Sequence, residues 1–334
     1  MTTNGNLRVG LAGAGMISLF HMRGWQEVEG ADVVAVCDPS IDRAKERAGE
    51  FDVSGVYSDA ETMLDECELD AIDIAASVDA HAPLVRAAAK RGVHVMVQKP
   101  LTRTVAEAER LIEEVGEGVR FMVHENYRFR PHYMTVRKWL AEGRIGEIRH
   151  AQMNVRCSGL VAKDGETPWL INRQPYLVDF DRNIVFETMI HHLDVLRLLL
   201  GPLSVKSAHL GWLNGNYRGE DTATIVLENE AGVVAVADGS LCAPGYPPLP
   251  SDRLELIGTE GTLIMDFDRI FLVGDEENAV QVDLTGRYQE CFTHSIRDFT
   301  TGIREGTPFE TDRLDNLQTL SLMEACYHAA GVEV

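Results

Sequence analysis

The segment from Val185 to Leu200 is apolar on nearly every side, yet it carries several ionisable side chains. Glu187, His191 and Asp194 are spaced i, i+4 and i+7, which places them on one face of a helix. Ionisable groups in so apolar a helix must be paired or functional, because an unpaired buried charge is costly. An imidazole titrates near neutral pH, so His191 is the natural general base for a hydroxyl proton, and Glu187 is placed to orient its ring.

Other interpretations of this helix stay open. Asp194 and Arg197 are three residues apart and form a simpler ion pair, and His191 can also be a purely structural buried histidine. A metal site that includes His192 is disfavoured, because adjacent histidines point about 100° apart on a helix of ~3.6 residues per turn. The sequence therefore predicts no metal site.

A lysine stands where a predicted strand ends. Gln98-Lys99-Pro100 closes an apolar run, and ligands of parallel sheets bind outside the carboxyl ends of the strands. At this edge the ammonium group of Lys99 can hydrogen-bond a hydroxyl and stabilise the alkoxide character that develops when a hydride leaves. Glu187 is an alternative partner for this lysine, and a solvated surface lysine is the ordinary fate of the residue type.

A glycine-rich turn follows the first apolar run. The residues Gly-Ala-Gly-Met-Ile-Ser at 13–18 open a helix, which is the context that a dinucleotide fingerprint requires. The first glycine allows the tight turn, the second admits a pyrophosphate, and the helix start supplies free N–H donors. Ser18 replaces the third glycine and is small enough for the helix and the strand to pack closely.

Asp38 strengthens this prediction. It ends the next apolar run, about 20 residues after the turn, where a carboxylate binds both hydroxyls of an adenosine ribose. The same carboxylate repels a 2′-phosphate, so the sequence favours NAD over NADP, although Arg43 nearby keeps NADP open. An ordinary βα turn with a capping acid is the structural alternative.

These candidates must be positioned by a sheet of parallel strands. Short, nearly continuous apolar runs alternate with amphipathic helices in the first third of the chain, as expected for strands covered on both faces. The runs are Leu7–Ala12, Val33–Cys37, Ala71–Ala76, Val93–Val97 and Val119–Val123. The helices between them span Ser40–Phe51, Asp59–Cys67, Asp79–Lys90 and Thr104–Val115, each with a capping residue first. This alternation predicts a doubly wound α/β fold.

The pattern changes after Asn126. Six segments from His209 onward alternate in polarity or run apolar between Gly, Asn and Asp turns, which predicts a mostly antiparallel sheet. Two closing helices, about Glu290–Arg304 and Asp312–Ala330, either cover one face of this sheet or return to the first domain. We therefore predict an N-terminal Rossmann domain over residues 1–126 and a C-terminal α/β domain with a large open sheet over residues 127–334.

Two long irregular segments, Ser158–Asn183 and Leu241–Asp252, lie in the predicted second domain. Loops of this length in a compact domain are usually functional or disordered, and the aromatic content of these two favours order. The first loop contains four residues that either line a sugar pocket or anchor the loop: Trp169, Arg173, Gln174 and Tyr176.

Composition limits the possible partners. The 334 residues include 52 acidic and 31 basic side chains, a formal net charge of −21, which repels phosphate backbones and anionic lipids. No apolar stretch is long enough to cross a bilayer, and the start of the chain lacks the pattern of an export signal. The six cysteines are scattered without close pairs, as in a reducing cytosol. We expect a cytoplasmic protein with no nucleic acid or membrane partner.

Five motifs, taken together, point to one family. They are Gly13-x-Gly15, Asp38, Lys99-Pro100, the Asn-Tyr-Arg-Phe-x-Pro run at 126–131 and His191-x-x-Asp194. The set resembles the Gfo/Idh/MocA oxidoreductases over essentially the whole chain. Within the family, the chain looks most like aldose dehydrogenases at Gln98-Lys99-Pro100, at Arg-Gln-Pro-Tyr 173–176, and at Glu187 with His191. The resemblance implies a Rossmann domain, a C-terminal domain whose open sheet often serves oligomerisation, and NAD(P)-dependent oxidation or reduction of sugars and polyols.

The resemblance also implies roles for individual residues. The family's Glu-Lys-Pro appears as Gln98-Lys99-Pro100, which gives Lys99 the catalytic lysine role. The family's Asp-x-x-x-His appears as Glu187-x-x-x-His191, which gives the histidine the acid/base role and the glutamate the carboxylate role. The family's Thr-Pro-Asn-x-x-His survives only as Ala76-Ser77-Val78 and His81.

The expected function is hydride transfer between NAD, with NADP possible, and a hydroxyl-bearing carbon of a sugar or polyol, in a dimer or tetramer of this chain formed through the C-terminal sheet. A sensor or regulator that binds the dinucleotide without turnover is the alternative. We expect the cofactor to contact Gly13, Gly15, Met16, Ile17, Asp38, Ala76, Ser77, His81, Gln98, Lys99 and Asn126. We expect the substrate to contact Lys99, Arg128, Trp169, Arg173, Tyr176, His191 and His192.

Overall fold

Six short strands in the first part of the chain form a parallel sheet in the order β3-β2-β1-β4-β5-β6. Five of them correspond to the predicted apolar runs: β1 (Leu7–Ala12), β2 (Ala31–Cys37), β4 (Ala71–Ile74), β5 (His94–Gln98) and β6 (Phe121–His124). The sixth, β3 (Gly55–Tyr57), has 3 residues, all half-buried, and leaves no apolar run in the sequence. This strand order is that of the doubly wound dinucleotide-binding fold, so the predicted fold class is confirmed here.

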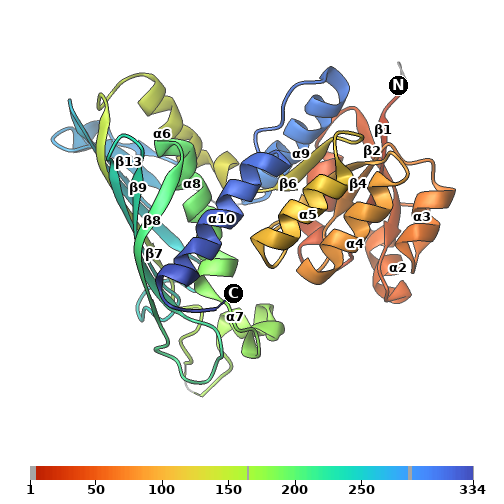
Figure 1. The fold of residues 1–334 in the computed structure, drawn as a ribbon, viewed down its shortest axis with the longest axis horizontal. Coiled ribbons are helices and arrows are strands. Elements are labelled where there is room, and N and C mark those ends of the chain that lie inside the picture. The colour runs from red at the N-terminus through yellow and green to blue at the C-terminus, as the bar shows by residue number, and fades with distance from the viewer. Residues whose placement is uncertain (1–4, 164, 285–287, 334) are drawn as a thin grey trace. The chain divides into compact units, whose positions relative to one another are not determined.

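Helices connect these strands and cover the sheet (Figure 1). They are α1 (Ser18–Gln26), α2 (Ile41–Glu50), α3 (Ala60–Glu66), α4 (Val78–Ala89) and α5 (Val105–Val115). Asp59 and Thr104 cap α3 and α5 as predicted, because their side-chain oxygens accept backbone N–H groups in the first turn. The start of α4 differs: Ser77 occupies the N-cap position, and the predicted cap Asp79 pairs with Arg103 instead.

The structure is a computed structural model that describes residues 5–163, 165–284 and 288–333, and they form two compact units. The first unit contains the chain up to Phe129 and a later segment that includes α9 (Tyr288–Glu305) and ends at Leu317. α9 belongs here because Ile296 and Phe299 pack into one core with Trp25 of α1. The units therefore differ from the predicted domains, in which residues 127–334 stay together. Helical periodicity shows that α9 has an apolar face but not which sheet that face covers.

The second unit contains an eight-stranded sheet in the order β14-β13-β12-β11-β7-β10-β9-β8. Neighbouring strands run antiparallel except β7 and β10, which are parallel, so the predicted mostly antiparallel sheet is confirmed. The strands are β7 (Ile148–Arg156), β8 (Leu203–Gly211), β9 (Thr222–Asn229), β10 (Val234–Ser240), β11 (Ser251–Gly258), β12 (Thr262–Asp266), β13 (Arg269–Leu272) and β14 (Val280–Gln281).

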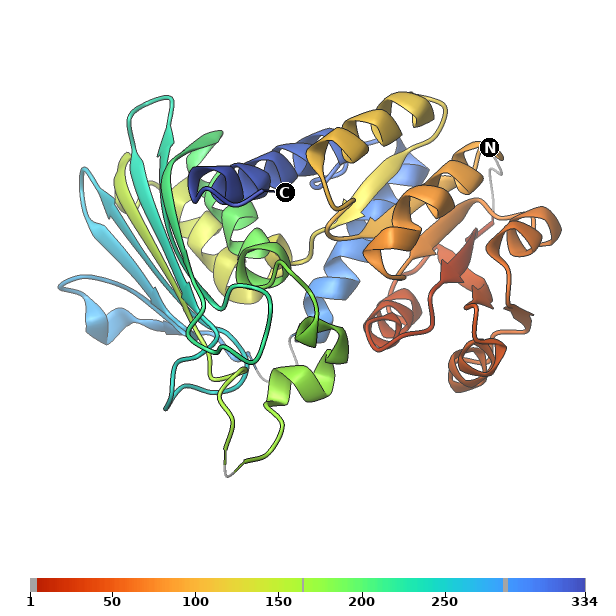
Figure 2. The ribbon, with the colours of Figure 1, turned by 60° about the horizontal axis from the view of Figure 1, so that its bottom comes forward.

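Helices α6 (Pro131–Ala141) and α8 (Ile190–Leu200) lie on one face of this sheet (Figures 1 and 2). α10 (Arg313–Ala329) supplies the C-terminal residues of the second unit, which resumes at Gln318. Shorter helices are η1 (Tyr127–Phe129), α7 (Trp169–Arg173), η2 (Pro175–Val178) and η4 (Glu276–Asn278), and a π-helix, η3 (Ile184–Met189), precedes α8. Strand residues that face the helices are buried and those that face away are half-buried or exposed, as the alternating pattern of β10 illustrates.

Two further observations concern membrane-spanning helices and cysteine thiols. In the described ranges no helix combines the length and the hydropathy needed to cross a membrane. The six cysteines are free thiols, and five of them are buried. Burial raises the pKa of Cys37 and of Cys326 to about 12, so these thiols stay protonated and serve as packing groups.

Phe299 tests whether α9 is part of the core of the first unit. Its ring is fully buried, lies edge-on to Trp25 and stacks on Phe309 with centroids 5.4 Å apart. We expect Phe299→Ala to lower the free energy of unfolding by about 3–5 kcal/mol, because the variant loses apolar burial and leaves a cavity. Urea denaturation measures this. The control Val273→Ala removes a side chain that is 56% exposed and should change stability by less than about 0.5 kcal/mol. Equal values for the two variants would contradict the assignment of α9.

Candidate active site

The turn between β1 and α1 leaves backbone groups open at the carboxyl edge of the parallel sheet. Gly13 has a φ of +106°, and a Cβ here would lie 2.5 Å from the Ala75 carbonyl oxygen, so only glycine fits. Apart from Gly15 itself and its two chain neighbours, none of the described residues has an atom within 4 Å of the place that a Cβ of Gly15 would take. Met16, which follows, is 44% exposed, and Ile17 is the N-cap of α1. This open helix start is what a pyrophosphate needs to reach backbone N–H groups, so the residues fit a dinucleotide.

Asp38 follows β2 and holds this turn in place. Its Oδ2 accepts the Ala14 N–H at 2.9 Å, and its Oδ1 accepts the Ser40 N–H at 2.8 Å and an Arg43 Nη2–H at 2.9 Å. A carboxylate has about four acceptor positions, and Oδ2 receives fewer donors than Oδ1, which leaves it capacity for a ribose hydroxyl. The carboxylate is 6% exposed and the Arg43 side chain is 58% exposed. Asp38 therefore links the end of β2 to the glycine turn.

Arg47 is a supporting residue that the sequence did not reveal. From α2 it donates through Nε to the Ser18 hydroxyl at 3.0 Å and through Nη2 to the Gly15 carbonyl oxygen at 3.4 Å. Ser18 in turn donates its hydroxyl to the same carbonyl at 2.6 Å. The serine that replaces the third glycine thus joins the turn to α2 and brings a positive charge close to it. Nothing in the spacing of these residues signals the contact.

Lys99 stands directly after β5, at the same edge of the sheet. Its backbone N–H donates to the side-chain Oε1 of Gln98 at 2.9 Å, and the Lys99–Pro100 peptide bond is cis. Since β1, β4 and β5 are parallel neighbours, Gly13, Ala76 and Lys99 all follow the carboxyl ends of their strands. The side chain of Lys99 is half-buried. The sequence prediction that Lys99 lies at the carboxyl edge agrees with this placement.

His81 joins the ends of two neighbouring strands. Its Nε2 lies 3.1 Å from the Ala76 carbonyl oxygen and its Nδ1 lies 2.9 Å from the Pro100 carbonyl oxygen. The residue is 1% exposed, and burial lowers the pKa of His81. Because both ring nitrogens face backbone carbonyls, the predicted cofactor contact gives way to a positioning role: His81 holds the end of β4 beside the segment that follows Lys99.

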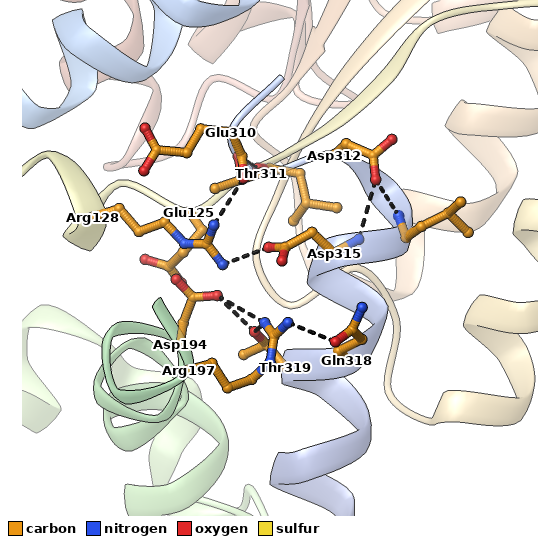
Figure 3. A network of polar contacts seen from close by, with 12 residues as sticks. Glu125, Arg128, Asp194, Arg197, Glu310, Thr311, Asp312, Asp315, Gln318 and Thr319 are labelled. Atoms are coloured by element: carbon orange, nitrogen blue, oxygen red, sulfur yellow. Dashed lines mark hydrogen bonds and ion pairs between the residues drawn. The ribbon is translucent and has the colours of Figure 1, made fainter. Parts of the chain in front are cut away.

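Asn126 and Arg128 follow β6 and are turned into the first unit. The Asn126 Nδ2 lies 3.2 Å from the Cys291 Sγ. Arg128 is 3% exposed, and it donates to the Glu310 carbonyl oxygen at 2.8 Å and to the Asp315 carboxylate (Figure 3). The predicted substrate contact of Arg128 is therefore corrected, because its buried charge is used to hold the first turn of α10 and the segment that precedes it.

Glu187 and His191 lie on elements of the second unit, and their helix differs from the prediction. The expected single helix Val185–Leu200 is a π-helix, η3, followed by α8. Glu220, 1% exposed, accepts the N–H groups of Asn183 and Val185, each at 3.0 Å, and the hydroxyl of Tyr327 at 2.7 Å. Burial raises the pKa of Glu220. A distant carboxylate thus satisfies backbone N–H groups at the start of η3. π-Helical turns are frequent at functional sites.

Tyr176 is brought to Glu187 by the irregular segment before η3. Partial burial of the ring, followed by the charge of Glu187 and a hydrogen bond to it, raises the pKa of Tyr176 above its usual range. Gln174 Nε2 donates to the Tyr176 hydroxyl at 3.2 Å, and the Tyr176 residue is 51% exposed. On α7 the Arg173 guanidinium lies 5.2 Å from the centroid of the Trp169 ring. The predicted loop residues thus form two local groups in the second unit, one of which includes Glu187.

His191 and His192 occupy the first turn of α8 and point to different surroundings. His191 is 9% exposed. His192 is fully buried, with Nε2 at 2.9 Å from the Asp252 Oδ1 and Nδ1 at 3.1 Å from the Thr188 carbonyl oxygen. The predicted substrate contact of His192 is corrected, because both of its ring nitrogens are used inside the unit. Its role is to fix α8, which carries His191.

Asp252 is the buried charge at the centre of this arrangement, and no sequence pattern singles it out. Besides His192, its carboxylate accepts the Tyr133 hydroxyl at 2.9 Å and an Arg130 Nη1–H at 3.3 Å. Burial alone would raise the pKa of Asp252, but the His192 and Arg130 interactions outweigh it and hold the pKa below its usual range. At the end of a proline-rich loop this aspartate has the sequence signature of an ordinary turn residue.

Asp194 and Arg197 form the ion pair that their spacing allows, with 3.7 Å between Oδ1 and Nη1. Thr319 of α10 donates its hydroxyl to Asp194 at 2.6 Å, and Arg197 Nη2 donates to the Gln318 Oε1 at 3.0 Å (Figure 3). Asp194 is therefore occupied by structural contacts. Within the part of the chain that the structure describes, no group of three His, Cys, Asp or Glu side chains is arranged to hold a metal ion.

Known proteins match the chain over both units. The model of the Gfo/Idh/MocA oxidoreductases, described as a family with an NAD-binding Rossmann fold, matches residues 7–125, and the model of the family's C-terminal domain matches residues 133–264. D-apiose dehydrogenase of Paraburkholderia graminis is 32% identical to the chain, with 98% of this chain and 89% of the relative covered. Myo-inositol 2-dehydrogenase of Thermotoga maritima is 25% identical, with 90% of each covered.

Solved structures of oxidoreductases also match the chain over both units. An oxidoreductase from Agrobacterium radiobacter, in complex with NAD+, L-tartaric acid and magnesium, has a TM-score of 0.89 at 28% identity. The match covers 98% of this chain and 96% of that structure. A levoglucosan dehydrogenase in complex with NADH and L-sorbose has a TM-score of 0.86 at 22% identity, with 98% and 97% covered, and this likeness shows the fold.

His132 gives the buried cluster around Asp252 a measurable pH dependence. Burial, assisted by the charge of Arg130, lowers the pKa of His132 from 6.5 to about 3. Below pH 6.5 the unfolded chain therefore binds a proton that the folded protein does not, so stability falls as the pH falls, until the folded protein also binds the proton near pH 3. We expect His132→Phe to remove about 1.4 kcal/mol per pH unit of this loss.

The measurement is chemical denaturation at several pH values between 6.5 and 4. The control is His328→Phe, because the side chain of His328 is 62% exposed. The stability curve of His328→Phe should run parallel to that of the parent protein, whereas the curve of His132→Phe should be flatter. A His132→Phe curve parallel to the parent would disprove the role of this imidazole.

Proposed function

Because the chain belongs to the Gfo/Idh/MocA oxidoreductase family, we propose that it is an NAD-dependent dehydrogenase that acts on a hydroxyl-bearing carbon of a sugar or polyol. One observation carries the proposal: an open glycine turn, the carboxylate of Asp38 and the lysine Lys99 all follow the carboxyl ends of strands in one parallel sheet. Ligands of such sheets bind at that edge.

The residues of the first unit would hold the cofactor. The N–H groups after Ala14 and the open space over Gly15 suit the pyrophosphate, and the Oδ2 of Asp38 suits a hydroxyl of the adenosine ribose. Bound NAD+ supplies the acceptor for the hydride. The proposed contacts on the nicotinamide side lie at the ends of the neighbouring strands or just after them: Ala76, Ser77, Gln98 and Asn126.

Three side chains would take part in the reaction, two at the substrate hydroxyl and one through the imidazole. Lys99 donates a hydrogen bond to the hydroxyl oxygen and stabilises its developing negative charge. His191 accepts the proton of the hydroxyl group while the hydride departs from the carbon that bears this hydroxyl. Glu187 is the carboxylate that supports the imidazole, and its charge contributes to the raised pKa of Tyr176.

The substrate is proposed to be an uncharged aldose or related polyol. The relatives named above act on D-apiose and on myo-inositol, and an uncharged sugar is compatible with a chain of net charge −21. Trp169, Arg173 and Tyr176 are the proposed contacts outside the reacting carbon, because aromatic faces and a few polar groups suit a sugar ring.

The protein is proposed to work in the cytoplasm as a dimer or tetramer. The face of the eight-stranded sheet that points away from the helices supports this, since Val226 and Val236 are cross-strand neighbours and half-buried in the single chain. Free cysteines suit a reducing compartment.

The decisive experiment is a panel of aldoses and polyols, D-apiose and myo-inositol included, assayed with NAD+ for absorbance of the reduced nicotinamide. We expect at least one sugar to be turned over by the parent protein. Lys99→Met should lower kcat by at least about a hundredfold and leave the dissociation constant of NAD+ within about threefold. The control is Lys90→Met, at an exposed lysine just beyond α4, which should match the parent. NAD+ binding without turnover of any sugar would favour a sensor, and full activity of Lys99→Met would refute the role of the lysine.

Cofactor choice gives an independent test. Asp38→Ala should raise the ratio of kcat/KM with NADP+ to that with NAD+ by at least about tenfold, because the carboxylate no longer repels a 2′-phosphate. Arg43, whose exposed guanidinium lies beside Asp38, then supplies a positive charge to that phosphate. Adding Arg43→Ala to this variant should reverse most of the gain. A ratio that stays at the parent value in Asp38→Ala would show that this carboxylate does not read the ribose.

A further inference from the structure

A chain of buried polar side chains runs through the parallel sheet and ends at Lys99. Asp73 on β4 and His21 on α1 are both fully buried, and His21 Nδ1 lies 2.8 Å from the Asp73 Oδ2. Trp25 Nε1 donates to the same oxygen at 2.7 Å. On the other side of the ring, His21 Nε2 lies 2.9 Å from the Gln98 Nε2, and the Gln98 Oε1 accepts the Lys99 N–H. None of these buried ionisable groups is used by the proposed reaction.

The direction of every hydrogen bond between Asp73 and Lys99 is fixed from both ends of the series. The Lys99 N–H is a donor, so the oxygen of the Gln98 amide must face it, and the amide NH2 must face His21. At the other end the Asp73 carboxylate only accepts, so His21 Nδ1 must carry a proton. The lone pair of the neutral imidazole is then on Nε2, which is where the amide NH2 points.

The surroundings of His21 support this assignment. His124 from β6 lies beside it with ring centroids 4.4 Å apart, and its Nδ1 lies 3.5 Å from the same Gln98 Nε2. Phe292 from α9 packs edge-on to His21. The charged or titratable side chains that face the His21 ring are thus Asp73 and His124, and no described group bonds the second oxygen of Asp73. Two imidazoles and one carboxylate therefore set the orientation of one amide.

We propose that Asp73 and His21 are positioning residues that hold the Gln98 amide in one orientation and thereby fix the backbone of Lys99. The part of the proposal that concerns catalysis rests on the proposed function of Lys99. The proposal also explains why glutamine suits position 98 in this chain: a carboxylate there would face the Nε2 lone pair of His21 and would require a second proton on the ring.

The first test reads the histidine ring directly. In ¹H–¹⁵N spectra of the full-length protein, with His21 assigned by its loss in His21→Asn, we expect a proton on Nδ1 and none on Nε2. His94 is an internal reference of the opposite kind, because its Nδ1 accepts the Arg120 N–H at 3.1 Å. In Gln98→Glu, His21 should carry protons on both nitrogens while His94 is unchanged. A proton on Nε2 in the parent protein, or an unchanged ring in Gln98→Glu, would overturn the proposal.

The second test separates positioning from simple stability. Gln98→Leu keeps the volume of the side chain but cannot bind the Lys99 N–H, so amide hydrogen exchange at Lys99 should accelerate at least tenfold. Its kcat should fall at least tenfold. Because Gln98 is also a proposed cofactor contact, the exchange rate at Lys99 is the readout that decides whether the loss comes from positioning. The matched control is Trp25→Phe, which removes the other donor to Asp73 but lies off the path to Lys99. It should leave both the exchange rate at Lys99 and kcat within about twofold, even where it lowers stability.

The outcomes are distinguishable. Slow exchange at Lys99 in Gln98→Leu, or equal losses of kcat in Gln98→Leu and Trp25→Phe, would contradict the positioning role. If no sugar is turned over by the parent protein, the proposed function fails, while the ring protonation of His21 and the exchange rate at Lys99 still decide whether the chain of hydrogen bonds exists.

Discussion

The geometry of the candidate site depends on one hydrogen bond, from the Ala14 backbone N–H to the buried carboxylate of Asp38. It fixes the turn after β1 against the end of β2, and Gly13 lets the same turn approach the end of β4 within a distance that no other residue tolerates. Three strand ends are thereby held together at one edge of the sheet. Parallel strands have their carboxyl ends at the same edge of a sheet. Lys99, which directly follows β5, therefore lies at that edge too.

Buried charges perform a similar task in each unit, and each is matched by several donors. Asp73 receives His21 and Trp25, and Asp252 receives His192, Tyr133 and Arg130. Desolvation makes such groups expensive unless partners are already in place, so they hold their elements in one arrangement. In the second unit the helix held in this way, α8, carries His191, and in the first unit the proposed series of hydrogen bonds continues from His21 through Gln98 to Lys99.

Much of this architecture can be predicted from the sequence, because it depends on local patterns. Nearly continuous apolar runs and the glycine turn are visible in single segments, and they place Asp38 and Lys99 at strand ends. The contacts that the prediction missed join residues far apart in the chain. Arg128 pairs with Asp315, 187 positions away, and His192 pairs with Asp252, 60 positions away. Apolar spacing also cannot separate an α-helix from the π-helix that Glu220 stabilises, nor can it tell which sheet α9 covers.

The central claim is that the edge defined by the turn after β1 binds NAD and presents it to Lys99. A crystal structure of the protein grown with NAD+ tests this most directly. We expect the pyrophosphate to lie against the N–H groups after Ala14, an adenosine ribose hydroxyl to donate to Asp38, and the nicotinamide to lie beside Lys99. A dinucleotide bound elsewhere, or bound here with the nicotinamide directed away from Lys99, would contradict it.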